Sequence, residues 1–273
     1  MTPKVEDLFQ RSLTAHLPPD SFGRLRGASV LIAGLGGGSN IAELLVRKGV
    51  GRMTIADLDV YEPHNIRQRG SLASSWGSEK TSVMAGRLKD INPHLDLTCV
   101  REGITVGNAP DLVRRADVVV DMLDFHALGE KVALCRAARV EGKCVVTTPS
   151  VVNGAVLYVF TPESPSFEEF FGYEVGMPPG ELALRFLKRL IPHFPPEAPE
   201  ALYRAAALGE RTIPLDAVGV DQASVLASAA VENLLLGRQE RIVAVPRGIQ
   251  ADLSDPSFLA RIVDFSDGEL RLR

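Results

Sequence analysis

The fold of this chain is decided by the stretch Val30-Leu31-Ile32-Ala33-Gly34-Leu35-Gly36-Gly37-Gly38-Ser39-Asn40. The apolar start predicts a buried strand, the glycines predict a tight turn, and Ile41, Leu44 and Leu45 share one face of the helix expected next. Glycine lets the backbone approach a phosphate closely, and the N–H groups at a helix start point towards its oxygens. The stretch therefore predicts a nucleotide site that uses Gly34, Gly36, Gly37 and Gly38.

A carboxylate follows the next apolar run, which covers residues 53–56. Asp57 ends that run about 20 residues after the turn, where an acid can accept a bond from a ribose hydroxyl. The glycine spacing departs from the usual dinucleotide pattern, because Ser39 stands where a third spaced glycine would fall. The turn alone therefore leaves the nucleotide open, and a turn that binds nothing is the alternative.

Composition predicts a soluble globular protein of 273 residues with 45% apolar and 23% charged residues. A net charge of −4 and a pI near 5.8 argue against a nucleic-acid-binding surface. The first ten residues have no apolar core, so no signal peptide is expected. The longest candidate membrane span, 218–236, is interrupted by Asp221 and Glu232. We expect a cytoplasmic protein that binds neither membrane nor nucleic acid.

The order of expected elements predicts an α/β fold with a largely parallel sheet covered by helices on both faces. Strands are expected at 30–33, 53–56, 95–100, 118–120, 143–146 and 155–160, with helices between them. Residues 161–214 are rich in proline and read as an insertion over the ligand edge of the sheet. Its Phe167, Phe170, Phe171 and Tyr173 either grip an apolar substrate chain or form the insertion's own small core. A helix at 217–236 and a strand at 241–245 are expected to complete the core.

Two cations follow Asp57 and bear on the choice of nucleotide. A triphosphate carries about four negative charges and normally recruits side-chain cations and magnesium, which Arg67 and Lys80 would serve. Lys80 falls in the first turn of an expected helix, where the helix dipole disfavours a cation unless an anion binds. The alternatives are a solvated surface lysine at position 80, and Arg69 as an equally plausible surface charge.

A pair of carboxylates follows the apolar run 118–120. Asp121 and Asp124 are expected at the carboxyl edge of the sheet, which faces the ligand crevice. Magnesium typically takes one or two carboxylates and fills its other positions with phosphate oxygens and water. We predict Asp124 as the magnesium ligand and Asp121 as a support for the loop. A capping aspartate before the next helix is the alternative.

Taken together, these residues resemble the ThiF-type adenylyltransferase family, the superfamily of ubiquitin-activating enzymes and their bacterial relatives. The resemblance runs over about residues 9–160 and resumes at 217–237. Its best-matched part contains the glycine turn, Gly49-Val50-Gly51, Asp57 with Asp59, Asn65, Arg67-Gln68, Gly77 and Lys80. Asp124 falls where the family keeps its magnesium aspartate, and Arg11 falls where the family has an arginine that reaches the ATP of the opposite subunit.

The resemblance implies a Rossmann-like homodimer in which a carboxylate attacks the α-phosphate of Mg·ATP, giving an acyl-adenylate and pyrophosphate. The carboxylate is often the C-terminus of a small protein or peptide. In this reading Asp57 holds the ribose, Asp124 holds magnesium and Asn65 positions the phosphates. Phosphate-binding cations are Arg67, Lys80 and the opposite subunit's Arg11, and the other nucleotide-site residues are Asp59, Gln68 and Asp121. The segments would then be an N-terminal helical segment (1–28), an ATP-binding core (29–160), the insertion over the active site (161–214) and a C-terminal helix and strand (215–273).

Two departures from the family pattern bear on function. The family has two residues between the asparagine and the Arg-Gln pair, but only Ile66 separates Asn65 from Arg67. Either the loop is shortened or His64 takes the asparagine's place. Residues 145–273 contain no cysteine, so no thioester step on the enzyme is expected. The chain also lacks Cys-x-x-Cys motifs, so no zinc is expected, and Cys99, Cys135 and Cys144 read as small buried residues.

Two other functions fit parts of the sequence. An NAD-dependent oxidoreductase would use the glycine turn and Asp57 but would leave Lys80 and Asp124 without a role. A non-catalytic partner subunit of the same fold would tolerate the short loop between Asn65 and Arg67.

Overall fold

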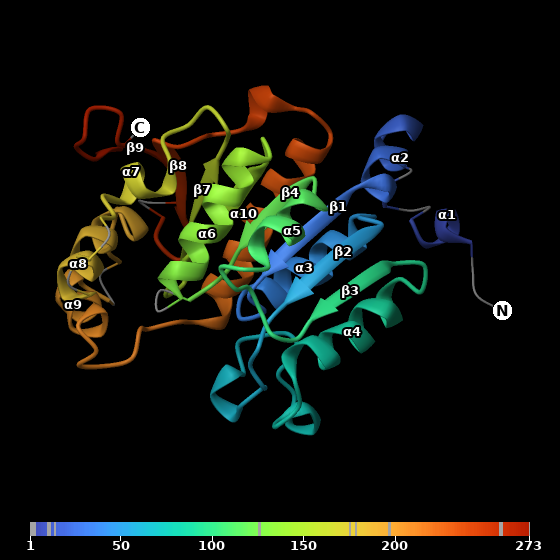
Figure 1. Cartoon of the computed structure of the whole chain (residues 1–273), viewed down its shortest axis with the longest axis horizontal. Coiled ribbons are helices and arrows are strands. Elements are labelled where there is room, and N and C mark those ends of the chain that lie inside the picture. The colour runs from blue at the N-terminus through green and yellow to red at the C-terminus, as the bar shows by residue number, and fades with distance from the viewer. Residues whose placement is uncertain are drawn as a thin grey trace.

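The computed structural model describes residues 4–9, 12–13, 15–124, 127–174, 176–177, 179–195, 198–256 and 259–272. Its strands are β1 (Ser29–Ala33), β2 (Arg52–Ala56), β3 (Asp96–Val100), β4 (Val118–Asp121), β5 (Cys144–Thr147), β6 (Ser150–Val151), β7 (Gly154–Phe160), β8 (Arg247–Asp252), β9 (Ala260–Asp264) and β10 (Arg271–Leu272). Across the described ranges they form one ten-stranded sheet in the order β10-β9-β8-β7-β5-β4-β1-β2-β3, and β6 pairs with β7 beside this path (Figure 1).

Five strands, β3-β2-β1-β4-β5, form the parallel half of the sheet. In the centre, Ile32 of β1 lies opposite Ile55 of β2 and Val120 of β4. Such continuous apolar runs are typical of strands buried on both faces. The Rossmann-like parallel sheet predicted from the sequence is confirmed in this half, and the carboxyl ends of its strands meet at one edge.

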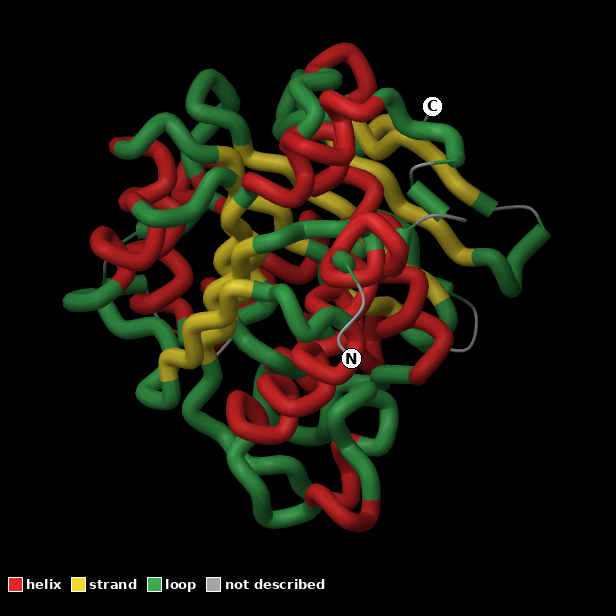
Figure 2. The backbone as a smooth tube through the Cα atoms, turned by 90° about the vertical axis from the view of Figure 1, so that its right-hand side faces the viewer, coloured by secondary structure: helices red, strands yellow, loops and turns green. Residues whose placement is uncertain are grey.

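Helices cover both faces of the sheet, as predicted (Figures 1 and 2). One face carries α2 (Pro19–Gly27), α3 (Gly38–Arg47), α4 (Lys80–Ile91) and α10 (Ala217–Leu235), and the other carries α5 (Ala109–Arg114), α6 (Leu128–Val140) and α7 (Phe167–Phe171). The strand residues alternate accordingly: Val118 and Val120 enter the first core, and Val119 enters the second. The remaining helices are α1 (Val5–Leu8), α8 (Pro179–Leu190), α9 (Glu200–Ala207) and the short 3₁₀ turns η1 (Pro63–Asn65), η2 (Ala73–Ser75) and η3 (Gln239–Arg241).

The second half of the sheet is antiparallel and was not foreseen. The strand expected at 241–245 is wrong: η3 occupies its start, and only Ala244 forms an isolated bridge, to Val159 of β7. Pairing resumes after Pro246, where β8 lies antiparallel to β7, and β9 and β10 follow. An apolar, β-branched run favours a strand, but a partner strand must also be in register beside it.

The segment 161–214 packs through aromatic side chains against the antiparallel half. Phe167, Phe170 and Phe171 of α7 are all buried, and Phe171 stacks on Phe186 of α8 with ring centroids 4.4 Å apart. These rings are core residues, as one of the two alternatives expected, but they share the core of this sheet face with Tyr158 and Phe160 and do not form a small separate one. The segment division given above stays a prediction. No helix in the described ranges is long and apolar enough to cross a membrane.

Candidate functional site

The glycine turn lies at the carboxyl edge of the parallel strands. Gly34 leaves β1 with φ of +89°, and its N–H donates to Ala56 O at the end of β2 (2.8 Å). A Cβ on Gly34 would lie 2.5 Å from Met122 O, so both the left-handed backbone and the neighbouring loop require glycine here. The turn thereby joins the ends of three strands, β1, β2 and β4.

No side chain caps the N-terminus of α3, whose N-cap residue is Gly37. Gln68 lies beside this turn: its Nε2 would be 3.8 Å from a Cβ on Gly36. Although Gln68 is only 5% exposed, its Oε1 has no hydrogen-bond partner. Buried polar atoms are almost always paired in native proteins, so an unpaired one beside a helix N-terminus suits a polar ligand.

Asp57 follows β2 and is held by backbone donors on both oxygens. Leu35 N donates to Oδ2 (2.6 Å), and Asp59 N donates to Oδ1 (2.8 Å). Burial raises the pKa of Asp57, and the positive charge of Lys80 opposes this shift. Each carboxylate oxygen has a second lone pair, so Asp57 can still accept a hydroxyl donor.

Lys80 begins α4, as predicted, and is only 6% exposed. Its Nζ donates to Asp59 Oδ2 at 2.9 Å and lies 3.9 Å from Asp57 Oδ1. These two carboxylates offset the unfavourable helix dipole, so the surface-lysine alternative is wrong for this side chain. The structure brings Lys80, Asp57 and Asp59 together next to the glycine turn.

Arg67 and Asp124 interact electrostatically at this edge of the sheet. Burial lowers the pKa of the Arg67 guanidinium, and the negative charge of Asp124 opposes that shift. Arg67 Nη1 also donates to His64 O (3.0 Å). Asp124 is exposed and immediately precedes residues outside the described ranges. No group of three or more metal-ligating side chains occurs among the residues described, so a magnesium ion here would need phosphate and water as its other ligands.

Asp121 occupies a supporting position. It is 1% exposed, its Oδ2 accepts Lys131 Nζ at 2.6 Å, and its Oδ1 accepts Leu123 N at 3.1 Å. Asn65 likewise serves its own turn, because its Oδ1 accepts Glu62 N (3.0 Å). The bond from Leu123 N agrees with the prediction that Asp121 supports its loop, and the roles of Asp121 and Asn65 at the nucleotide stay predictions.

Arg11 lies outside the described residues, whereas Phe9 and Leu13 on either side of it are described. Phe9 packs on Phe22, with ring centroids 5.4 Å apart, and Leu13 packs near Gly49. Gly49 lies just before the amino end of β2, at the edge of the sheet opposite the glycine turn. Phe9 and Leu13, which flank Arg11 in the sequence, therefore lie at the edge of the sheet opposite the glycine turn.

Sequence reasoning missed the side chains that support the site from distant elements. Lys131 pairs with Asp121, and Asp221 of α10 bonds both Asn40 and Arg69. A lysine ten residues after an aspartate is only a weak sign of an ion pair. Arg69 and Asp221 are 152 positions apart, so no sequence pattern connects them.

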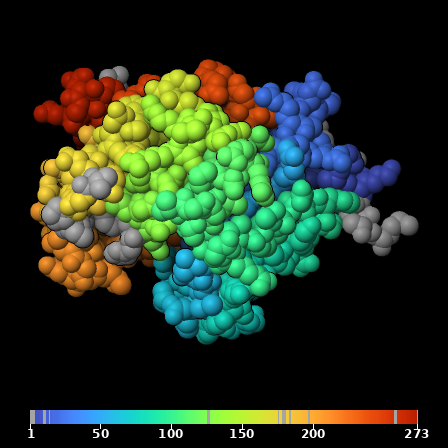
Figure 3. Space-filling model, viewed as in Figure 1, coloured from blue at the N-terminus to red at the C-terminus, as the bar shows by residue number. Residues whose placement is uncertain are grey.

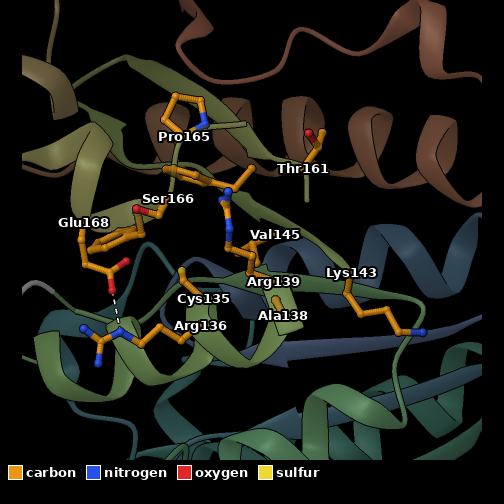
Figure 4. A pocket seen from close by; sticks show the side chains of 12 residues that line it. Cys135, Arg136, Ala138, Arg139, Lys143, Val145, Thr161, Pro165, Ser166 and Glu168 are labelled. Atoms are coloured by element: carbon orange, nitrogen blue, oxygen red, sulfur yellow. Dashed lines mark hydrogen bonds and ion pairs between the residues drawn. The ribbon is translucent and has the colours of Figure 1, made fainter. Parts of the chain in front are cut away.

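A pocket with a volume of about 150 Å³ lies away from these residues, between α6 and α7 and beside Lys143 and Thr161 (Figure 4). Lys143 precedes β5, so this pocket is at the amino edge of the parallel strands. Two of its basic side chains are engaged within the protein, since Arg136 pairs with Glu168 at 2.6 Å and Arg139 bonds Ser164 O at 2.8 Å.

Comparison with known proteins agrees with this geometry. The ThiF family model matches residues 9–199. The chain is 35% identical over 126 residues to the tRNA threonylcarbamoyladenosine dehydratase of Haemophilus influenzae, covering 45% of this chain and 48% of that protein. It is 34% identical over 142 residues to the sulfur carrier protein ThiS adenylyltransferase of Escherichia coli, covering 51% and 55%. The chain thus spans about half the length of the curated relatives it matches.

Solved structures share the fold. The E. coli tRNA N6-threonylcarbamoyladenosine dehydratase in complex with AMP superposes with a TM-score of 0.63 at 20% identity, covering 86% of this chain and 97% of that one.

Proposed function

Because this chain belongs to the ThiF family, we propose that it is an ATP-dependent adenylyltransferase. A carboxylate oxygen attacks the α-phosphorus of ATP, the bond to the β-phosphate oxygen breaks, and pyrophosphate leaves with the electron pair. The products are an acyl-adenylate and pyrophosphate, and no proton transfer is needed. Catalysis of this kind depends on positioning and on cations placed against the developing phosphate charge.

The observation that carries the proposal is the buried ammonium of Lys80 beside Asp57 and the glycine turn. A buried cation is costly unless it is paired. Lys80 pairs with Asp59 and lies near Asp57, and in the proposed site it also binds phosphate oxygens of a nucleotide on the turn. The turn and the helix N-terminus alone can bind the pyrophosphate of a dinucleotide, so a dinucleotide site would not need Lys80 or Asp124. Family membership also disfavours the oxidoreductase alternative.

The residues at this edge fit Mg·ATP. The uncapped start of α3 is open to phosphate oxygens, and the unpaired Gln68 Oε1 is open to a hydroxyl or water donor. In the proposed site, Asp57 accepts a ribose hydroxyl, and Arg67 and Lys80 bind phosphate oxygens. Asp124 would ligate magnesium, which when bound neutralises phosphate charge.

We propose that the carboxylate to be activated is the C-terminus of a small protein or peptide, or belongs to a small acid. Relatives include an adenylyltransferase of a sulfur carrier protein. The lack of cysteine in 145–273 favours transfer of the acyl group to an external nucleophile. We further propose a cytoplasmic homodimer in which Arg11 reaches the partner's ATP, because the flanks of Arg11 are anchored at the opposite edge of the sheet.

Ligand-induced stabilisation tests the proposal. A ligand that binds only the folded state raises the melting temperature, so Mg·ATP should raise it and NAD should not. Asp124→Ala should remove the magnesium dependence of the ATP effect, whereas Asp111→Ala, an exposed acid on α5, should keep it. Equal shifts with ATP and NAD would contradict the proposal, and a magnesium-dependent shift in Asp124→Ala would refute the metal assignment.

A non-catalytic partner subunit remains the second candidate, favoured by the short connection from Asn65 to Arg67. It predicts that ATP does not bind at all. Mixing Arg11→Ala with Lys80→Ala subunits provides a further test, because one of the two shared sites would then be intact. Recovered ATP binding in the heterodimer supports the shared site, and no recovery in a confirmed heterodimer contradicts it.

A further inference from the structure

A cluster of polar side chains joins the phosphate loop to the C-terminal helix. Asp221 Oδ1 accepts Asn40 Nδ2 at 2.8 Å and Arg69 Nη2 at 3.0 Å. Asn40 Oδ1 in turn accepts the backbone N–H of Arg69 at 3.0 Å. These three residues, which we call the α10 clamp, come from α3, the loop after η1, and α10.

The clamp acts directly next to the proposed phosphate-binding residues. Arg69 follows Arg67 and Gln68 in sequence, and Asn40 lies in the first turn of α3. Fixing both the backbone and the guanidinium of Arg69 therefore sets where Arg67 and Gln68 lie relative to the glycine turn. The loop that contains them belongs to the lobe of residues 60–79, coloured cyan to teal, which projects from the body of the molecule (Figure 3).

Stability alone does not explain the clamp. The side chains of Arg69 and Asp221 are 34% and 51% exposed, and ion pairs that exposed add little to stability. The buried member is Asn40, at 1% exposure, whose amide is fully oriented by Ser39, Arg69 and Asp221. An amide locked in this way fixes the geometry of its neighbours.

We propose that Asp221 is a positioning residue for nucleotide binding: through Asn40 and Arg69 it holds Arg67 and Gln68 in place for the phosphates of ATP. This inference rests on the proposed function. It makes α10, which is remote in sequence, part of the machinery that selects a triphosphate. Asp221 itself does not touch the nucleotide in this proposal.

Binding of Mg·ATP and of adenosine to Asp221→Ala, measured by titration calorimetry, tests the proposal. The Kd for Mg·ATP should rise about tenfold, because a charge-assisted phosphate contact is misplaced. The Kd for adenosine, which makes no phosphate contact, should stay within about twofold. Asp221→Asn keeps an oxygen acceptor for Asn40 and Arg69, and should recover most of the affinity for Mg·ATP.

Coupling to Arg67 separates positioning from general loosening. Arg67→Ala should weaken Mg·ATP binding about tenfold in the wild-type chain but only about twofold in the Asp221→Ala background. The matched control is Asp216→Ala, which removes the N-cap of the same helix (Val218 N to Asp216 Oδ1, 2.8 Å) and should leave the Kd unchanged. Full Arg67 sensitivity in the Asp221→Ala background, or equal loss of adenosine and Mg·ATP, would overturn the proposal.

Amide hydrogen exchange distinguishes failure of this inference from failure of the proposed function. In ligand-free protein, the amides of residues 66–72 should exchange about tenfold faster in Asp221→Ala than in wild type, because the clamp no longer holds the loop. Unchanged exchange overturns the clamp whatever the nucleotide. If wild type binds no ATP, the proposed function fails, and the role of Asp221 in nucleotide binding fails with it. Faster exchange in Asp221→Ala would still show that the α10 clamp holds the loop.

Discussion

Replacing Lys131 by methionine should destabilise the chain strongly, because it removes the cation that pairs with a buried carboxylate. Asp121 is 1% exposed, and Lys131 Nζ lies 2.6 Å from its Oδ2. Methionine keeps the apolar stem of lysine but leaves the carboxylate unpaired. Breaking a buried ion pair on one side costs about 3–5 kcal/mol.

The loss of stability in Lys131→Met should therefore be about 3–4 kcal/mol at pH 7. For a chain of this size, the loss at pH 7 corresponds to a fall in melting temperature of about 8 °C.

Urea denaturation followed by circular dichroism measures this loss. The control is the double variant Lys131→Met/Asp121→Asn, in which a neutral amide can still accept the Leu123 N–H that now bonds Asp121 Oδ1. We expect the double variant to recover about 2 kcal/mol relative to Lys131→Met at pH 7. A loss below about 1 kcal/mol in the single variant, or a double variant less stable than the single one, would show that the pair does not hold the loop before Asp124.

Two further predictions concern stability. Burial raises the pKa of Asp57 above its ordinary value, so the stabilisation that it provides when protonated is lost as the pH rises through the raised pKa. Wild type should therefore lose stability relative to Asp57→Asn from pH 4 to pH 7, and urea titrations in which wild type gains stability relative to this variant would contradict the reasoning. Gly219→Ala should lower the free energy of unfolding by about 2–3 kcal/mol, measured by calorimetry, because its Cβ would lie 2.0 Å from Val152 O. The control is Gly86→Ala on α4, where a Cβ meets nothing within 4 Å, and which should raise the free energy of unfolding by about 0.5–1 kcal/mol. Equal effects of the two substitutions would refute the steric argument.

The sequence by itself determined the parallel half of the fold and which residues lie at the carboxyl edge of its strands. Apolar strands, glycine turn and first helix are adjacent along the chain, so local patterning fixes them. The position of Lys80 in a first helical turn was also readable, because a helix start depends on nearby residues. The connection rules of parallel strands then bring Asp57 and Asp124 to the same edge.

Only the tertiary structure decided how these residues are held. The pairing of Lys80 with Asp59, of Asp121 with Lys131, and of Arg69 with Asp221 joins segments whose separation along the chain carries no pattern. The antiparallel strands β8 to β10 depend on a partner strand in register. The strand predicted at 241–245 is therefore wrong, although the composition of this run favours a strand. Side-chain contacts between distant elements follow from packing, and packing is a property of the whole chain.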